Sequence, residues 1–100
     1  MLFFVKLRVE PKDLSLEELW EIWEKEAGAA LQAMQTQKVR SLYKVSGQRR
    51  VLGIFDVADH DELDRLLMAA LPLAHHLEAE EILPLRDYEA FAEDVMRRWG

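Results

Sequence analysis

Two kinds of hydrophobic spacing follow one another along this chain, and their order limits the folds it can adopt. Residues 2–10 and 38–46 alternate between two sets of side chains, and residues 50–57 are rich in branched and aromatic side chains, so all three predict strands. Residues 15–36 carry apolar side chains at helical spacing after a Ser15–Glu18 capping box, which predicts a helix. The turn signal around Gly47 then favours an antiparallel hairpin.

The second half of the chain adds a helix, a strand and a further helix. Asp59 and Glu62 form another capping signal, and the apolar spacing over residues 63–70 predicts a short helix. Residues 75–83 are predicted as a strand, and residues 88–99 as an amphipathic helix. The order β-α-β-β-α-β predicts an α+β, ferredoxin-like fold: a four-stranded antiparallel sheet with two helices on one face, here with an added C-terminal helix.

Composition fits a single domain over residues 1–100. The chain is 50% apolar and 32% charged, which suits one small core and argues against disorder. No apolar run approaches the roughly 20 residues of a membrane helix, and the N-terminus does not resemble a signal peptide. Because the chain has no cysteine, thiolate sites and disulfides are excluded, and we expect a cytoplasmic protein. The net charge of −6 disfavours nucleic acid as a partner.

The predicted sheet has an apolar second face. Strand parity assigns six residues to it: Leu2, Phe4, Leu42, Leu52, Ile54 and Ile82. An exposed apolar patch usually marks an interface, so we expect this face to be covered by the C-terminal helix, by another subunit, or by both. The alternative is that some of the strand parities are inverted.

Few residues offer catalytic chemistry. The chain has no P-loop, no Rossmann glycine pattern and no G-x-S-x-G elbow. His75 and His76 are expected near a strand start, where neighbours point to opposite faces, so we expect solvated histidines and no metal site. Glu26 lies at the edge of the apolar stripe of the first helix, where partial desolvation would raise its pKa and favour proton transfer. Alternatively, Glu26 reaches water or pairs with a lysine or arginine.

Positive charge is concentrated along the predicted hairpin. Arg40 and Lys44 are expected on one strand face together with Leu42, close to further lysine and arginine residues. In an acidic protein such a cluster could bind a small carboxylate. The alternative is that these charges only protect an edge strand from aggregation.

Several short segments together resemble the muconolactone Δ-isomerase family. They are Met1-Leu2-Phe3-Phe4-Val5-Lys6 (MLFHVK in the family), Arg40-Ser-Leu-Tyr-Lys-Val-Ser-Gly47 (R-x-L-W-R-x-x-G), Ile54-Phe55-Asp56-Val57 (VFDV) and Leu71-Pro72-Leu73. Their order and spacing are more specific than any one of them. The resemblance covers residues 1 to about 85 and implies the same ferredoxin-like fold.

The resemblance implies cofactor-free isomerisation of a small molecule. The family moves a proton across an allylic system, converting muconolactone to 3-oxoadipate enol-lactone in aromatic catabolism. Such a reaction needs one base and stabilisation of a dienolate. By position, Glu26 is expected to be the base, while Arg40 and Lys44 would hold the substrate carboxylate or the oxyanion. The resemblance also implies a homodecamer, and the apolar sheet face by itself predicts at least a dimer.

The chain departs from the family at several candidate substrate-binding positions. Phe4 and Gln48 stand where the family has histidines, Tyr43 replaces a tryptophan, and Lys44 replaces the second arginine. A site that loses polar partners loses affinity for a polar substrate, so the substrate could be a lactone other than muconolactone. The tail over residues 87–100 is also more helical than the family's usual tail.

Two other functions stay open at this point. One is a non-catalytic protein of the same fold that binds a small ligand or serves as an assembly subunit. The other is a cofactor-independent monooxygenase, which rests on fold analogy alone. The position of Glu26 separates catalysis from binding: a place inside a pocket with Arg40 or Lys44 favours catalysis, and a place in bulk water favours binding.

Overall fold

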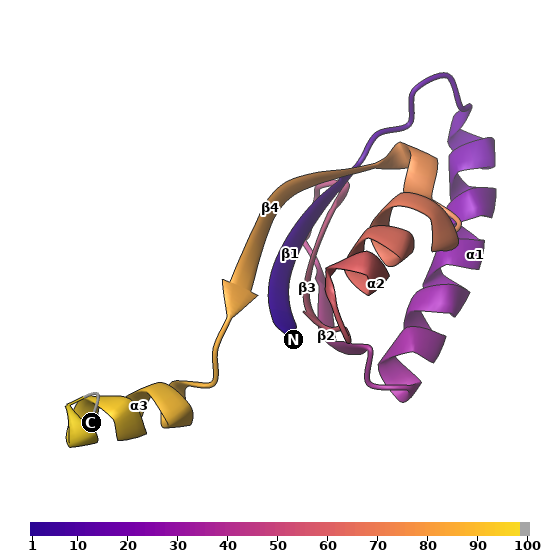
Figure 1. The fold of residues 1–100 in the computed structure, drawn as a ribbon. Helices are drawn as coiled ribbons and strands as arrows, with labels where there is room; N and C mark the ends of the chain where they lie inside the picture. The colour runs from indigo at the N-terminus through magenta and orange to yellow at the C-terminus, as the bar shows by residue number, and fades with distance from the viewer. Residues whose placement is uncertain (99–100) are drawn as a thin grey trace.

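The computed structural model describes residues 1–98 and contains a four-stranded antiparallel sheet with its core helices on one face (Figure 1). The elements in chain order are β1 (Leu2–Val9), α1 (Leu16–Gln35), β2 (Val39–Lys44), β3 (Arg50–Asp56), α2 (His60–Arg65), a π-helical turn η1 (Leu66–Ala70), a 3-10 turn η2 (Ala74–His76), β4 (Leu77–Leu85) and α3 (Tyr88–Arg97). The strand order β2-β3-β1-β4 confirms the predicted ferredoxin-like fold. Trp99, which was predicted to lie on the last helix, is outside the described residues.

Both predicted helix starts are confirmed by their caps. The Ser15 hydroxyl accepts a hydrogen bond from the Glu18 N–H at 3.2 Å, and the Glu18 carboxylate accepts one from the Ser15 N–H at 2.9 Å. At α2, the Asp59 carboxylate accepts a hydrogen bond from the Glu62 N–H at 2.8 Å. These side chains satisfy backbone donors that the first turn of a helix leaves free. The caps therefore fix the residues at which the two helices begin.

The core lies between the sheet and the helical layer. The burial of β1 alternates strictly, and its odd-numbered side chains face the helices. The main buried cluster consists of Phe3, Val5, Leu7, Val39, Phe55, Val57, Leu63 and Leu67. Leu63 of α2 and Leu67 of η1 are buried members of this cluster, whereas α1 contributes only the partly buried Ala33 and Met34, so α2 and η1 cover this part of the sheet more closely than α1 does.

Each edge strand contains an irregularity that reverses part of the predicted alternation. In β2 the register shifts just before Ser41, and Leu42 then lies opposite Gly53 and packs against the core. In β4 a second shift places Ile82 opposite Val5, whose side chain points into the core. The prediction that Leu42 and Ile82 lie on the outer face is therefore wrong. A bulge adds one residue to a strand and sends the side chains beyond it to the other face.

The segment before β4 also differs from the prediction. The last strand begins at Leu77, and His75 and His76 belong to the turn η2. Leu73 and Ala74 are buried, and Leu73 packs with side chains of β1 and α1, so the chain must turn tightly here before it can enter the sheet. The expectation that His75 and His76 occupy a strand is wrong, and the Nδ1 of His76 lies 3.1 Å from a backbone carbonyl oxygen.

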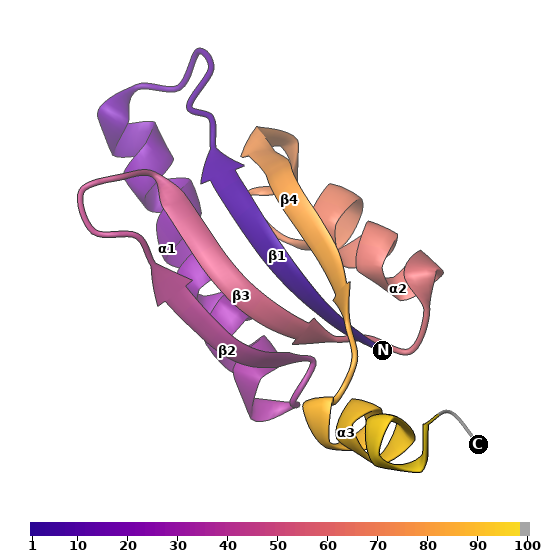
Figure 2. The same cartoon turned by 90° about the vertical axis from the view of Figure 1, so that its left-hand side faces the viewer.

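No helix formed by residues 1–98 lies across the outer face of the sheet (Figure 2). Among the described residues, α3 lies beyond the end of β4 and contains no buried side chain, so it does not cover its own sheet. The apolar residues of this face are half-buried or exposed: Leu2, Phe4, Leu52, Ile54, Leu83 and Leu85. None of the helices formed by residues 1–98 is long and apolar enough to span a membrane.

Because Gly53 of β3 has no side chain, the side chain of Leu42 on the neighbouring strand β2 can lie close to it. A Cβ atom on Gly53 would lie 2.8 Å from Cδ1 of Leu42 and 3.1 Å from the carbonyl oxygen of Ser41. We expect Gly53→Ala to lower the free energy of unfolding by about 1–3 kcal/mol, measured by urea denaturation. Gly28→Ala is the control, because its new Cβ would meet no atom within 4 Å and alanine favours a helix. Equal stability of the Gly53→Ala protein and the wild type would contradict this account.

Candidate active site

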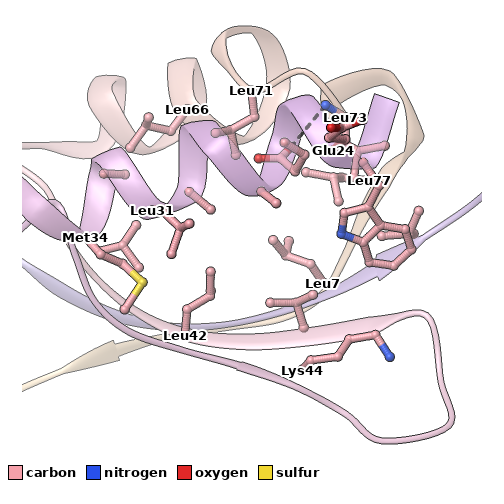
Figure 3. Close-up of a pocket in the computed structure, with 18 of the residues that line it drawn as sticks. Leu7, Glu24, Leu31, Met34, Leu42, Lys44, Leu66, Leu71, Leu73 and Leu77 are labelled. Atoms are coloured by element: carbon pink, nitrogen blue, oxygen red, sulfur yellow. Dashed lines mark hydrogen bonds between the residues drawn. The ribbon is translucent and has the colours of Figure 1, made fainter. Parts of the chain in front are cut away.

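A cavity of about 750 Å³ lies between α1 and the helix-facing side of the sheet (Figure 3). Residues of all four strands, of α1, and of the η1–η2 segment line it. Of the 20 lining residues, 17 are apolar, and the other three are Glu24, Glu26 and Lys44. The cavity can therefore hold an organic ligand while offering it very few charged groups.

Three of the nine α1 residues that line the cavity are alanines, whose small side chains leave room between this helix and the sheet. Ala27, Ala30 and Ala33 line the wall that this helix forms, and Leu42 lies across the space from β2. Trp20 and Trp23 stack with ring centroids 5.8 Å apart at the N-terminal part of the helix. The rings do not fill the space, and Trp20 stays 57% exposed.

Glu26 is the one polar side chain among the buried residues that the structure describes, with 9% of its surface exposed. Its Oε1 accepts a hydrogen bond from the backbone N–H of Leu73 at 3.0 Å. Loss of water raises the pKa of the Glu26 carboxyl, and the hydrogen bond from Leu73 offsets part of that rise. The partner of Glu26 is thus a neutral backbone donor, and the alternative of an exposed or cation-paired carboxylate does not occur.

Lys44 lines the same cavity from the end of β2. Its ammonium group donates a hydrogen bond to the Val45 carbonyl oxygen at 2.8 Å and stays accessible. It is the one cation among the described residues that line the cavity, so the structure brings Glu26 and Lys44 to the same cavity. Within residues 1–98, no three histidine, aspartate or glutamate side chains are grouped so that they could hold a metal ion.

Arg40 lies outside this cavity. Its Nε donates a hydrogen bond to Oδ2 of Asp56 at 3.1 Å, and the guanidinium group holds the pKa of the Asp56 carboxyl below its usual range. The expectation that Arg40 and Lys44 share a strand face is wrong, because the register shift of β2 falls at Arg40. Within a single chain, Arg40 therefore forms an ion pair with Asp56 at the edge of the sheet.

The other three predicted substrate-binding residues also lie away from the cavity. Phe4 lies on the outer face of the sheet, opposite Ile54 of β3. Tyr43 is 68% exposed on the same face, one step along β2 from Lys44. Gln48 lies in the β2–β3 turn, where its side-chain oxygen accepts a hydrogen bond from Arg50 at 3.2 Å. Their part in a substrate site stays a prediction.

Sequence reasoning missed the apolar walls of the cavity and the donor that holds Glu26. The helical spacing of Trp20, Trp23 and Met34 predicts a buried face, but the same spacing suits a face that lines an empty space. Their large size beside three small alanines is the signal that could have suggested a cavity. The Leu73 N–H has no such signal, because nearly every residue carries a backbone donor.

Three comparisons with known proteins all find similarity to muconolactone isomerases. The family model described as muconolactone delta-isomerase matches residues 1–90. A muconolactone delta-isomerase of Cupriavidus pinatubonensis is 38% identical over 74 residues, which cover 73% of this chain and 79% of that protein. The crystal structure of a muconolactone isomerase matches with a TM-score of 0.67 and 27% identity, over 85% of this chain and 88% of that one. The similarity therefore includes the whole sheet, α1 and α2.

Glu26→Gln should leave the protein as stable as the wild type or more stable near neutral pH. The folded-state pKa of Glu26 is raised, so its stabilising contribution is complete below the unfolded value of 4.5 and is lost as the pH rises through the raised value. In urea denaturation we expect the unfolding free energy of the variant, relative to that of the wild type, to increase as the pH rises from about 4 to about 8. The exposed control Glu21→Gln should show no such trend, and a variant less stable than wild type near pH 8 would contradict the assignment.

Proposed function

The chain belongs to the muconolactone Δ-isomerase family, and on that premise we propose that it shifts a proton within a small unsaturated lactone, muconolactone or a related compound. As a member of that family it is an isomerase of aromatic catabolism. The observation that carries the proposal is the desolvated carboxylate of Glu26 at an apolar cavity. A base with a raised pKa in such a place is suited both to remove a proton from carbon and to return it.

The proposed reaction moves one proton and leaves the base unchanged. The Glu26 carboxylate removes the proton from the γ carbon of a butenolide, and the electron pair of the broken C–H bond forms the β,γ double bond. The electrons of the former α,β double bond pass into the lactone carbonyl, which gives a dienolate. The lactone carbonyl forms again when Glu26 returns the proton to the α carbon. Atoms and charge balance, and the double bond has moved by one position.

Lys44 supplies the positive charge that such a reaction needs. It is the cation among the lining residues, and its ammonium group could pair with the substrate carboxylate or with the developing oxyanion. Leu73 has a different part: its N–H engages Oε1 of Glu26 and thereby orients the carboxylate. We expect the base to be held by the backbone and the substrate by Lys44.

Replacement of the base tests the proposal directly. We expect Glu26→Gln to lower turnover of muconolactone by roughly 10²- to 10⁴-fold, because the side chain keeps its size but can no longer accept the proton. The assay follows the loss of the substrate's absorbance. Glu21→Gln, an exposed change on the same helix, is the matched control and should turn over like the wild type. Near-wild-type turnover by Glu26→Gln would favour the alternative of a binding protein.

A second pair of variants separates the two candidate cations. Lys44→Met should raise KM by about 10-fold or more, as expected for the loss of a charge-assisted contact. Arg40→Met should mainly lower the melting temperature, because it leaves the Asp56 carboxylate without its guanidinium partner. A larger rise in KM for Arg40→Met than for Lys44→Met would place the substrate carboxylate at the rim of the sheet instead.

We also propose that two copies associate through the outer face of the sheet. The registers make its apolar side chains continuous across three strands, since Phe4 lies opposite both Ile54 and Leu83, and Leu2 lies opposite Leu85. A patch of this kind on a small protein suits an interface in which the same surface meets itself across a two-fold axis. A decamer of such dimers and a cytoplasmic location stay predictions.

The C-terminal helix supports association with a second copy. Figure 1 shows α3 on the opposite side of the sheet from α1 and α2, on the side where a docked copy would lie. Its apolar side is open in a single chain: Val95 is 47% exposed, Met96 is 76% exposed and Tyr88 is 75% exposed. We expect this side to contact the neighbouring subunit.

Two adjacent residues of β4 provide a matched test of this interface. Leu83 lies on the outer face and is 44% exposed, whereas Ile82 points to the other face and is 41% exposed. We expect Leu83→Lys to shift the protein toward monomer in light scattering at micromolar concentration, because a lysine would be buried against a second copy. Ile82→Lys should keep the oligomer. A monomeric wild-type protein under these conditions would contradict the interface.

A further inference from the structure

The charged residues of the cavity lie toward one of its two ends. Only a short connection joins the end of α1 to the start of β2, so the last turn of the helix lies beside Val39, and Lys44 lies at the other end of the strand. In Figure 3, Lys44 and Glu24 lie toward one end, while Leu31, Met34 and Leu66 lie toward the other. Every lining residue of α1 beyond Glu26 is apolar: Ala27, Ala30, Leu31, Ala33 and Met34.

The apolar end is too long for the reacting part of a simple lactone. Met34 lies eight positions after Glu26 in α1, which is about 12 Å along the helix axis. A butenolide ring with a carboxymethyl arm extends about 7 Å, given bonds of about 1.5 Å. A ligand whose ring carbon meets Glu26 and whose carboxylate meets Lys44 occupies the charged part of the cavity. The far end would remain empty of substrate.

The side chains at the apolar end of the cavity indicate which kind of chemical group should occupy it. Val39 and Leu42 of β2, Leu66 of η1 and Leu71 just after it line this end, and none of these side chains can donate or accept a hydrogen bond. Water there finds few partners, so an apolar group that displaces it gains affinity. The whole cavity is in the size range of sites that enclose a ligand much larger than muconolactone.

We propose that the substrate of this site is an unsaturated lactone acid that also bears an apolar substituent, an alkyl or aryl group, on its ring. This inference rests on the proposed function and names the substrate class of the same site. The carboxylate binds at Lys44, the ring lies at Glu26, and the substituent extends between α1 and β2 toward Met34. The proton shift is the same as in the unsubstituted lactone, because the substituent takes no part in it.

Binding of unreactive analogues tests this proposal without any turnover. The probes are saturated γ-lactones with a carboxymethyl arm and a methyl, propyl or pentyl group on the ring, and isothermal titration calorimetry of the full-length protein gives the Kd. We expect affinity to rise by about three- to fourfold per added methylene, the gain expected when each methylene is buried. Affinity that stays flat or falls with chain length overturns the proposal.

A variant at the apolar end locates the effect. Ala30→Leu adds bulk to the wall beyond Glu26, so we expect it to abolish the gain from methyl to pentyl. The control is Ala90→Leu, the same change on the exposed side of α3, which should bind the series like the wild type. Melting curves verify that both variants fold, and the wild-type series decides the question even when one does not. A gain that persists in Ala30→Leu overturns the assignment to this end of the cavity.

Turnover measurements separate this inference from the function on which it rests. If substituted lactones bind more tightly but no lactone is isomerised, the substrate class stands as a ligand class and the isomerase function is contradicted. If muconolactone is isomerised with a higher kcat/KM than every alkylated butenolide, the isomerase function stands and the substrate class is wrong.

Discussion

The hydrogen bond from the Leu73 N–H to Glu26 ties the two parts of the helical layer together. Leu73 is 1% exposed and packs with Leu19 of α1 and Val9 of β1, so its backbone donor has no access to water. A buried donor without a partner costs about as much as a lost hydrogen bond, and the acceptor nearest to it is a carboxylate. The same contact that completes the fold therefore holds a desolvated base at the edge of the cavity.

The cavity places a limit on the stability of this small domain. A fully packed interface between α1 and the sheet would bury more apolar surface and would leave fewer atoms without neighbours. The small side chains of Ala27 and Ala30 and the stacked pair Trp20–Trp23 leave the space open instead. The burial that holds the protein together is concentrated under α2 and η1, where Leu63 belongs to the main cluster. Substrate binding would supply part of the missing contact.

The two apolar surfaces of the protein lie on opposite sides of one sheet. The helix-facing side lines the cavity with Glu26 and Lys44, and the outer side carries the half-buried Phe4 and Ile54. Because the sheet separates them, a second copy can cover the outer side without filling the cavity. The bulge in β2 makes this division possible, since it sends Leu42 inward. The outer side is then suited to assembly and the inner side to the ligand.

The sequence by itself determined most elements of this fold and their order, and it singled out Glu26 as a carboxylate at the edge of an apolar helix face. The periods of two and 3.6 residues, the caps at Ser15 and Asp59 and the turn at Gly47 act over a few neighbouring residues, so each can be seen in the sequence. The place of Glu26 on its helix followed from the same local rule. Only the tertiary structure decided which residues join it: Lys44 is at the cavity and Arg40 is not. That choice depends on bulges where strands pair across the sheet, and on a backbone donor 47 positions away from Glu26, which no local pattern records.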